Sequence, residues 1–380
     1  MRPKLGVLDF NPIQYHAPLY QRLTRRGKVD LDVLYLSDRG YRAAIDRGFG
    51  VCVTWDIDLL SGYVQNFLNT SDNCLSIPKR IRMLNRWIVS QEAIIIYGYS
   101  QPWMIFAMVL CRTRRIPYLL RGDSRLDSHS TGIRGFLRNI IVRLAVSASS
   151  ACLAIGQLNE DFYHSYGAKR VTFAPYSVDD ERFARPPKIG RTELLARWGM
   201  HPSKAVIMFC GKLYPGKRPL DIIAATKLLP YEVSTLFVGD GILADRIRAT
   251  LSPGHGAVTG FVNQSELPSY YHLADILVLP SEAEKWGLVV NEAMAAGALP
   301  VVSDRVGAAA DLVCGLGEVY PCGDIAALAE ALNRALGRIK DPEIRCRVKH
   351  HAARYSLDRT AIGFEQATLA VTVHMNVVTR

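Results

Sequence analysis

The sequence lacks several features that would assign a chain directly to a class of protein. Its 8 cysteines include no Cys-x-x-Cys pair and no His-bearing ligand spacing, which predicts reduced, buried thiols in a cytosolic protein. The first residues, MRPKLGVLDF, contain no long apolar core and no small-residue cleavage site, so we expect no export. The most apolar windows, Trp103 to Cys111 and Ile140 to Ile155, are too short or are interrupted by Arg143. A bilayer span needs about 20 mostly apolar residues.

Composition and charge indicate a folded chain with a basic N-terminal half. Hydrophobic residues make up 49% and charged residues 21% of the 380 residues, which is typical of globular proteins. This length exceeds what one hydrophobic core usually organises, so two domains are expected. Up to Arg185 the chain has 25 Lys and Arg against 16 Asp and Glu, and after it 21 against 19. The basic half would attract nucleic acid, acidic lipid headgroups or diphosphate-bearing substrates, and charge alone does not choose among them.

Short β-branched runs alternate with helical patterns, which predicts doubly wound α/β domains with parallel sheets. After Phe183 the alternation gives way to ARPPKIGRTELLARWGMHPSK, whose prolines, glycine and charges predict a linker. We expect an N-terminal domain over residues 1–185, a linker over 186–203, a second domain over 204–354 and a helical segment, 355–380, that packs back on the first domain. The expected strands are Leu5 to Phe10, Leu31 to Leu36, Ala93 to Tyr97, Tyr118 to Arg121, Ala151 to Ile155 and Val171 to Ala174, then Ala205 to Cys210, Ser234 to Val238, Ala257 to Thr259, Ile276 to Leu279 and Leu299 to Ser303.

The most informative motif lies in ILVLPSEAEKWGLVVNEAMAAGALPVVS, which is expected to form a strand, a polar loop, a helix and a second strand. Glu284 lies in the loop, and Gly287 allows the backbone to approach a ligand closely. The amide groups around Leu288, at the start of the helix, suit a donor diphosphate. Glu292 follows Glu284 by eight positions, so both carboxylates are expected to face polyhydroxyl groups in one cleft. The alternative is a pair of surface carboxylates, against which the neighbouring small residues and buried strand argue.

Two other glycine-bearing turns follow expected strands. In CGKLYPGKRPLDII, Gly211, Lys212 and Lys217 are candidates for holding a diphosphate, although basic loops are commonly only solvated surface. The second turn, LFVGDGILADRI, satisfies the dinucleotide pattern Gly-x-Gly-x-x-Ala. The acidic residue that should close the next strand is absent from AVTGFV, so we interpret Gly239 and Asp240 as a turn near a nucleotide base.

Together these motifs resemble the retaining glycosyltransferases of family 4, which have the GT-B fold of two Rossmann-like doubly wound domains facing across a cleft. The resemblance covers most of the chain, and its most specific part is the Glu-x7-Glu signature formed by Glu284 and Glu292. It implies that Glu284 contacts the donor sugar and Glu292 the nucleotide ribose, while Gly211, Lys212 and Lys217 bind the donor phosphates. Lys212 stands where the family has arginine, which keeps the positive charge but loses the two-pronged geometry.

The resemblance also suggests contacts at the nucleobase and in the first loop of the chain. GFVNQSELPSYYHLADILVLPS is similar to the family's base-binding turn, which implies that Phe261 and Val262 lie beside the nucleobase. The family's first loop often carries a Gly-Gly pair near the diphosphate, but here it reads FNPIQYHAPLYQRL. Gln14 and His16 of this loop are candidates for facing the acceptor or the donor phosphate, and a capping or packing role is the alternative for His16.

A histidine that many family members carry in the middle of the N-terminal domain is missing from YLLRGDSRLDSHS. Asp123 holds the nearest equivalent place, and it is a candidate for accepting the proton of the acceptor hydroxyl, or for merely capping a turn. Arg121 and Arg125 are candidates for binding anionic substrate groups. His129 is a weaker candidate.

The resemblance implies a mechanism in which Lys212, Lys217 and the amides of Gly287 and Leu288 stabilise the departing nucleotide diphosphate. The anomeric configuration is retained, and a donor phosphate oxygen takes the proton of the acceptor. We expect neither a metal nor another cofactor. A UDP- or GDP-sugar would serve as co-substrate.

One segment suggests contact with a membrane. PKRIRMLNRWIVS sorts on a helical wheel into a basic and an apolar side, as in helices that lie on anionic membranes and equally in surface helices over a core. With the basic run Arg112 to Arg115, it leads us to expect peripheral contact with the inner membrane. The expected acceptor is then a polyprenyl-diphosphate-linked saccharide of surface polysaccharide or exopolysaccharide biosynthesis. The residues of the basic side are Lys79, Arg82 and Arg86, and those of the apolar side are Ile81, Leu84, Trp87 and Ile88.

Two other functional classes stay open at this point. One is a nicotinamide-dependent oxidoreductase that uses the turn from Gly239 to Ala244. The other is a non-catalytic GT-B-fold subunit that binds a nucleotide sugar or serves as a scaffold, which the changed histidine and Gly-Gly positions suggest. Nucleic-acid binding is not expected, because the basic residues are dispersed and no aromatic-interleaved motif accompanies them.

Overall fold

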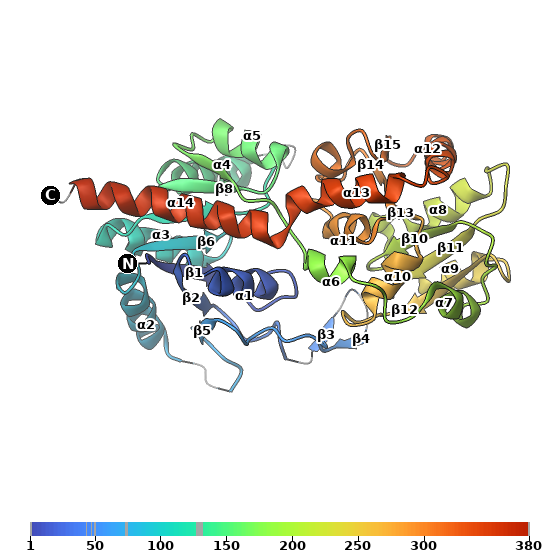
Figure 1. The fold of residues 1–380 in the computed structure, drawn as a ribbon. Coiled ribbons are helices and arrows are strands. Elements are labelled where there is room, and N and C mark those ends of the chain that lie inside the picture. Colours follow the sequence, from blue (N-terminus) through green and yellow to red (C-terminus); the bar gives the residue numbers. More distant parts are fainter. Residues whose placement is uncertain are drawn as a thin grey trace. The chain divides into compact units, whose positions relative to one another are not determined.

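The computed structural model describes residues 2–42, 44–46, 48, 51–72, 75–126 and 132–378. The chain divides into two compact units, each with its own parallel sheet and covering helices (Figure 1). The expected pair of doubly wound α/β domains is therefore present. Unit 1 consists of Met1–Arg42, Asp58–Tyr176 and Leu357–Arg380, and unit 2 consists of Ala43–Ile57 and Ser177–Ser356.

Unit 1 is built on a seven-stranded parallel sheet in the order β5-β2-β1-β6-β7-β8-β9. Its central strands are continuous apolar runs because both faces of the sheet are covered. The chain proceeds outward from β1 in one direction and from β6 in the other, so the strand order reverses between these two neighbours. The strands are β1 (Lys4–Asp9), β2 (Asp30–Tyr35), β5 (Val64–Phe67), β6 (Ala93–Tyr97), β7 (Tyr118–Arg121), β8 (Ala151–Ala154) and β9 (Val171–Phe173), and the helices are α1 (Ala17–Arg26), α2 (Ile77–Val89), α3 (Pro102–Arg114), α4 (Gly132–Ser147), α5 (Gln157–Ser165) and α14 (Leu357–Val378).

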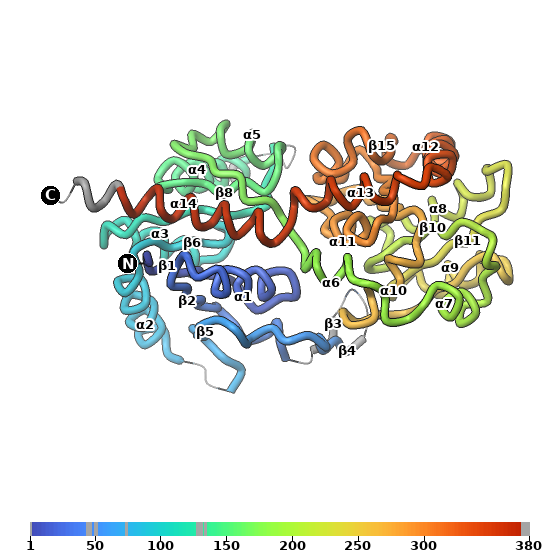
Figure 2. Tube along the Cα trace, viewed as in Figure 1, coloured from blue at the N-terminus to red at the C-terminus, as the bar shows by residue number. Residues whose placement is uncertain are grey.

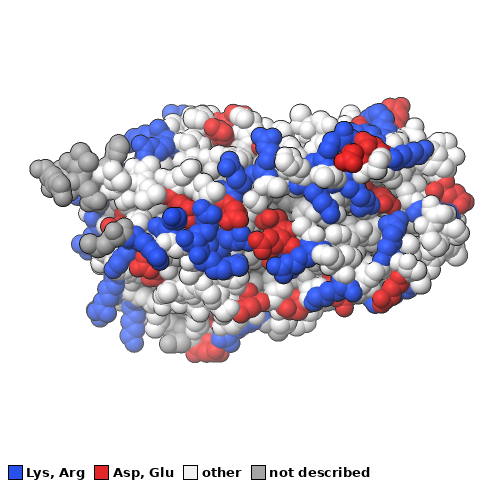
Figure 3. Space-filling model, viewed as in Figure 1, with Lys and Arg blue, Asp and Glu red and all other residues white. Residues whose placement is uncertain are grey.

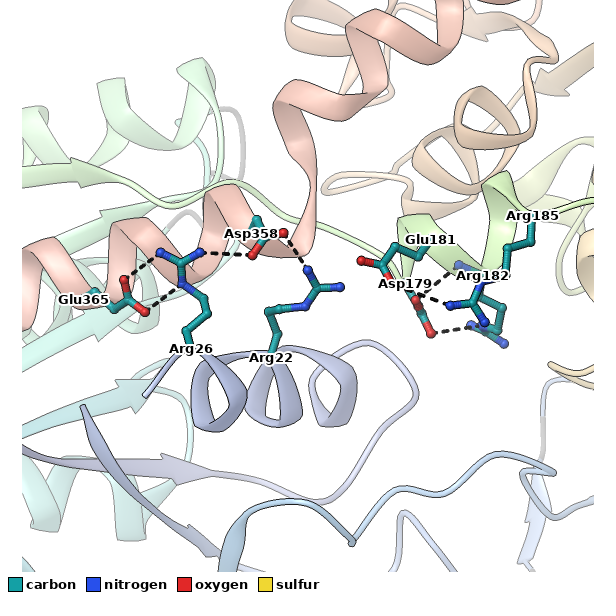
Figure 4. A network of polar contacts seen from close by, with 8 residues as sticks. All are labelled: Arg22, Arg26, Asp179, Glu181, Arg182, Arg185, Asp358 and Glu365. Atoms are coloured by element: carbon teal, nitrogen blue, oxygen red, sulfur yellow. Dashed lines mark hydrogen bonds and ion pairs between the residues drawn. The ribbon is translucent and has the colours of Figure 1, made fainter. Parts of the chain in front are cut away.

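The C-terminal helix α14 is part of unit 1 and packs against β8, β9 and α1. Arg26 of α1 forms a two-pronged pair with Glu365, with N–O distances of 2.8 and 3.0 Å. Arg22 donates to Asp358 over 2.5 Å (Figure 4). The buried hydroxyl of Thr360 donates to the carbonyl of Pro175. Charged pairs therefore fix this helix to α1, and the Thr360 hydrogen bond fixes it to the segment after β9.

Unit 2, whose chain trace is drawn in Figure 2, is built on a six-stranded parallel sheet. The strand order is β12-β11-β10-β13-β14-β15. Its strand order reverses between β10 and β13. The strands are β10 (Val206–Cys210), β11 (Ser234–Val238), β12 (Gly256–Gly260), β13 (Ile276–Leu279), β14 (Leu299–Ser303) and β15 (Glu318–Tyr320). The helices are α6 (Asp180–Ala184), α7 (Arg191–Arg197), η1 (Pro215–Lys217), α8 (Pro219–Thr226), α9 (Ala244–Thr250), α10 (Leu267–Leu273), α11 (Leu288–Ala296), η2 (Ala309–Val313), α12 (Ile325–Arg338), α13 (Ile344–Ala352) and η3 (Ala353–Tyr355).

The stretch expected to be a linker is part of unit 2. The chain passes between the units at Tyr176 and Ser177, before the expected boundary at Arg185. Within residues 186–203 the helix α7 forms, with Leu194 and Leu195 buried. Its first residue, Arg191, donates to the carbonyl of Leu273 over 2.5 Å. The middle of this stretch is therefore a helix packed on unit 2, and its prolines lie before and after that helix.

A second departure is a segment of the N-terminal half that joins unit 2. This segment, Ala43–Ile57, is called the arm below, and its two neighbours in sequence, β2 and β5, both lie in unit 1. It contains a short antiparallel hairpin of β3 (Ala44–Asp46) and β4 (Val51–Val53). Asn263 donates from its side chain to the carbonyl of Thr54 over 2.6 Å, and the amide of Ser265 donates to Asp56 over 3.1 Å.

The cysteines differ from the expectation of buried thiols. Among those that the structure describes, Cys111, Cys152 and Cys210 are buried and free of disulfides, and burial raises the pKa of each thiol to about 12. Three others are exposed, because they lie in the arm and at the surface of unit 2. These are Cys52, Cys314 and Cys346.

The helix expected to contact a membrane, α2, is a surface helix over a core. Leu84, Trp87 and Ile88 of its apolar side lie in the main hydrophobic cluster of unit 1. Its basic side is exposed, and Lys and Arg side chains gather over this end of unit 1 in Figure 3. Three of the four residues of the expected apolar side are therefore buried in the protein, whereas Ile81 is 38% exposed, and contact of this helix with a membrane stays a prediction. No helix in the described part of the chain is long and apolar enough to cross a membrane.

Candidate functional site

The predicted donor residues of unit 2 lie where its strand order reverses. Lys212 follows the carboxyl end of β10, and Glu284 follows that of the neighbouring strand β13. Doubly wound sheets bind their ligands at such a reversal. The ammonium group of Lys217 pairs with the carboxylate of Glu284, and the two side chains are 19% and 21% exposed. The structure therefore brings these two predicted residues together at a place that a ligand can reach.

Glu284 and α11 are held by the loop that follows β14. The amide of Gly307 donates to the carbonyl of Glu284 over 2.9 Å, and the amide of Ala308 donates to that of Trp286 over 3.0 Å. Gly287 then begins α11 with a φ of +101°, a left-handed conformation that favours glycine. This turn exposes the first amides of a nine-residue helix, including that of Leu288, beside the Lys217–Glu284 pair. The arrangement suits an anion next to a polyhydroxyl group.

Glu292 is more buried than the sequence pattern predicted. Its side chain is on the buried face of α11 and the residue is 1% exposed. The hydroxyl of Tyr271 donates to its carboxylate over 2.5 Å. Burial, and then the nearby Cys210 and Glu292, raise the pKa of Tyr271, which keeps this phenol protonated as a donor. Glu292 therefore lies beneath the end of β10, and a direct contact with ribose remains a prediction.

The glycines of the turn after β11 are explained by close packing between two loops. A Cβ atom on Gly239 would lie 1.9 Å from the carbonyl oxygen of Gly211, and the φ of Gly239 is +144°. The amide of Leu213 donates to the carbonyl of Asp240 over 2.8 Å, so the turns after β10 and β11 are joined backbone to backbone. The dinucleotide-like pattern thus has a structural cause that requires no nicotinamide cofactor.

The arm contacts both ends of the predicted donor site, which the sequence did not indicate. The ring of Trp55 lies 6.3 Å from that of Phe261, measured between centroids, in the turn that also contains Val262. At the other end, a Cβ atom on Gly48 would lie 2.5 Å from the side chain of Lys212. Trp55 therefore lies beside a predicted site residue, and the sequence did not indicate this because no local motif marks a segment after β2 as part of unit 2.

Unit 1 has a polar cluster at its own strand reversal, between β1 and β6. Asp9 ends β1, is 2% exposed and lies 2.8 Å from Nδ1 of His16 through Oδ2. The hydroxyl of Tyr20 donates to the same oxygen over 2.7 Å. The ring of Tyr97, at the end of β6, lies 4.5 Å from that of His16.

The structure excludes a side-chain capping role for His16 but shows its ring packed against Tyr97, so the predicted contact with acceptor or phosphate stays a prediction. His16 precedes α1, but its side chain does not cap that helix and turns to Asp9 instead. A carboxylate on Nδ1 fixes the tautomer and leaves Nε2 as an acceptor. Asp9 was not among the predicted residues, although the sequence places its carboxylate at the end of the first expected strand.

Arg121 has a structural place that differs from the predicted one. It is 2% exposed and donates to the carbonyls of Ala174 and Pro175 over 2.6 and 3.2 Å. Its guanidinium also lies over the rings of Tyr176 and Phe364. We therefore replace the predicted anion contact of Arg121 by a structural role. Its guanidinium already joins β7 to the segment that follows β9 and to α14.

The remaining candidates of unit 1 lie in two loops. Asp123 follows β7 and is half-buried, and burial together with this nearby carboxylate raises the pKa of Tyr176. Arg125 and Gln14 are half-buried in the loops after β7 and β1, where their predicted contacts remain untested. His129 lies outside the described residues. In the part of the chain that is described, no three His, Cys, Asp or Glu residues are grouped as a metal site would require.

Comparison with protein families defines the class of unit 2. Residues 191–353 match the family described as Glycosyl transferases group 1, so unit 2 carries a domain of this type. Solved structures share the fold of nearly the whole chain. A crystal structure of Anabaena Alr3699/HepE in complex with UDP covers 97% of this chain and 100% of its own, with a TM-score of 0.73 and 16% identity. A glycosyltransferase from Rickettsia africae covers 97% and 99%, with a TM-score of 0.70 and 12% identity.

Curated relatives match parts of the chain. A D-inositol 3-phosphate glycosyltransferase of Xylanimonas cellulosilytica is 32% identical over 43% of this chain and 42% of its own. The sulfoquinovosyl transferase SQD2 of Arabidopsis thaliana is 32% identical over 36% of this chain and 26% of its own. A putative teichuronic acid biosynthesis glycosyltransferase, TuaC, of Bacillus subtilis is 26% identical over 54% and 51%. The chain thus spans about half the length of these relatives or less.

Proposed function

We propose that the protein is a retaining glycosyltransferase that moves a sugar from a nucleotide-sugar donor to a hydroxyl group. The observation that carries this proposal is the Lys217–Glu284 pair at the strand reversal of a group 1 domain. The spacing of Glu284 and Glu292 supports assignment to family 4. UDP is the favoured nucleotide, because a neighbour of the same fold was crystallised with it, and GDP is the alternative.

In the proposed reaction the bond between the anomeric carbon and the donor phosphate oxygen breaks, and the acceptor oxygen bonds to that carbon. The proton of the acceptor hydroxyl goes to a donor phosphate oxygen. Lys212, Lys217 and the first amides of α11 stabilise the charge that develops on the diphosphate. Glu284 accepts hydrogen bonds from the sugar hydroxyls once Lys217 has turned to the phosphates.

We assign the acceptor to unit 1, with Asp9 and His16 at its strand reversal as the groups that orient the reacting hydroxyl. A lipid-linked saccharide, such as a polyprenyl diphosphate sugar, is the proposed acceptor class. A relative named as a putative teichuronic acid biosynthesis glycosyltransferase supports a saccharide as acceptor, and the lipid link is part of the proposal. The basic charge excess of the N-terminal half suits a diphosphate-bearing acceptor.

We expect UDP or GDP to raise the melting temperature of the protein by a few degrees at about 100 times its Kd, because a ligand that binds only the folded state stabilises it by mass action. The measurement is a thermal-shift screen with UDP, GDP, ADP and NAD. Lys217→Ala should reduce the shift, while Lys227→Ala, an exposed lysine of the same unit, should not. A shift caused by NAD alone would favour the oxidoreductase, and no shift with any nucleotide would argue against the proposed donor site.

Trp55→Ala is expected to raise the KM for the donor about tenfold, the scale of one aromatic contact with a base. The reason is that Trp55 packs beside Phe261 at the predicted base position. Steady-state kinetics with varied donor measures the change, and Trp55→Phe should restore most of the affinity. An unchanged KM in Trp55→Ala would show that the arm only covers the site.

A further inference from the structure

Helix α4 presents a stripe of large apolar side chains to solvent. Five of its residues are between 41% and 65% exposed, although the opposite side of the helix, with Val142 and Val146, is buried in the core of unit 1. Their spacing places them on adjacent rows of one helical face. Exposed apolar patches of this kind mark interaction sites in soluble proteins. The stripe consists of Phe136, Leu137, Ile140, Ile141 and Leu144.

A cationic side chain, that of Arg143, lies beside this stripe. Arg143 is exposed on the helix, and with Phe136, Ile140 and Tyr166 it lines a groove of about 390 Å³. The groove lies between α4 and the end of α5. An apolar stripe edged by a cation is the pattern of helices that lie in the interfacial region of a membrane.

A basic pocket lies just beyond the C-terminal end of α4. It has a volume of about 710 Å³ and includes the residues 148–150 that follow the helix. Four cationic side chains line it, and none of its described lining residues is acidic. They come from the end of α3 and from the segment before β9, and they are Arg112, Arg115, Lys169 and Arg170.

The basic pocket is separate from the candidate site of unit 1. It includes Tyr118 and Ser150, which lie at the amino ends of β7 and β8. Asp9 and Tyr97 lie at the carboxyl ends of β1 and β6, and all these strands are parallel. The two places are therefore at opposite ends of the strands of one sheet, so the pocket is not part of that candidate site.

We propose that the α4 stripe and the basic pocket form a surface that docks on an anionic lipid bilayer. The stripe enters the interfacial region, and the four cations bind the phosphates of lipid headgroups. Charge complementarity favours an anionic bilayer as the occupant, since the pocket beside the stripe is lined by four cations and by no acidic residue among those described. The proposal does not depend on the transfer reaction, but it would place the enzyme where lipid-linked acceptors are found.

The test is cosedimentation of the full chain with vesicles of phosphatidylcholine, alone or mixed with phosphatidylglycerol. We expect binding to the mixed vesicles, and a loss of about tenfold in Phe136→Ser/Leu144→Ser, because two anchoring side chains are removed from the interface. Arg115→Ala/Lys169→Ala should weaken binding and make it less sensitive to salt. Leu228→Ser/Ile242→Ser, which replaces two exposed apolar residues of unit 2, should bind as the wild type does.

Two results would overturn the proposal. One is vesicle binding that is absent or is unaffected by changes in both the stripe and the pocket. The other is a dimer in solution that the stripe variant converts to a monomer, measured by light scattering, which would assign the stripe to a second copy. The nucleotide-induced thermal shift of the stripe variant is measured in parallel. Because the stripe lies in unit 1, a retained shift with lost vesicle binding separates docking from donor binding.

Discussion

Glu284→Gln is expected to lower turnover by at least about 100-fold, the scale of losing a transition-state electrostatic contact. The carboxylate pairs with Lys217 at the strand reversal of unit 2, and the proposed mechanism uses it to hold the sugar hydroxyls while Lys217 meets the diphosphate. Glutamine keeps the shape of the side chain but removes its charge. The measurement is kcat with saturating donor, together with the melting temperature to confirm folding.

A nearby residue of the same type provides the control for Glu284. Glu282 lies two positions upstream, is exposed and pairs with Arg218 on the surface. Glu282→Gln should leave turnover within about twofold, because an exposed ion pair contributes little. Lys217→Ala should show a loss similar to that of Glu284→Gln. Near-normal turnover in both site variants, with folding intact, would mean that the chemistry takes place elsewhere or that the chain is a binding subunit.

The architecture of each unit was predictable because its signals are local. Buried β-branched runs alternate with helical patterns, and each expected strand corresponds to a strand of the structure, from β1 to β14. The edge strand β5 and the last strand β15 were missed, since short runs such as VQNF and EVY carry little apolar pattern. The helix α7 within the expected linker was not predicted, because the flanking prolines and charges hide so short a helix and only the burial of Leu194 and Leu195 reveals it.

The candidate site was only partly predictable, for a related reason. Lys217 and Glu284 lie in turns after predicted strands, and the strand order that makes these turns neighbours follows from the doubly wound topology. The contact between Trp55 and Phe261 joins segments far apart in sequence, and no local pattern encodes it. Arg121 shows the opposite case, in which a residue with a structural role was predicted to bind a ligand. A cation at the end of a strand resembles a ligand-binding residue until its partners, the carbonyls of the two residues that follow β9, are known.

Asp9→Asn and His16→Gln are each expected to lower kcat/KM for the acceptor by about 10- to 100-fold, which corresponds to one charge-assisted hydrogen bond. Asp9 holds Nδ1 of His16 at 2.8 Å, so the carboxylate acts through the histidine and not on the substrate itself. If the two residues work as one unit, the double variant should lose no more than either single one. Steady-state kinetics with varied acceptor measures all three.

The variant Tyr20→Phe tests whether the Asp9–His16 pair has a functional or only a structural role. It removes the hydrogen bond from the Tyr20 hydroxyl to Oδ2 of Asp9 and leaves His16 in place. We expect it to cost about 1 kcal/mol of stability, the net value of a hydrogen bond, with little change in kcat/KM. The thermal shift caused by nucleotide should be unchanged in all these variants, since that site lies in unit 2. If Tyr20→Phe lowers kcat/KM as much as His16→Gln does, the cluster only maintains the end of β1, and the acceptor contact has to be sought at Asp123.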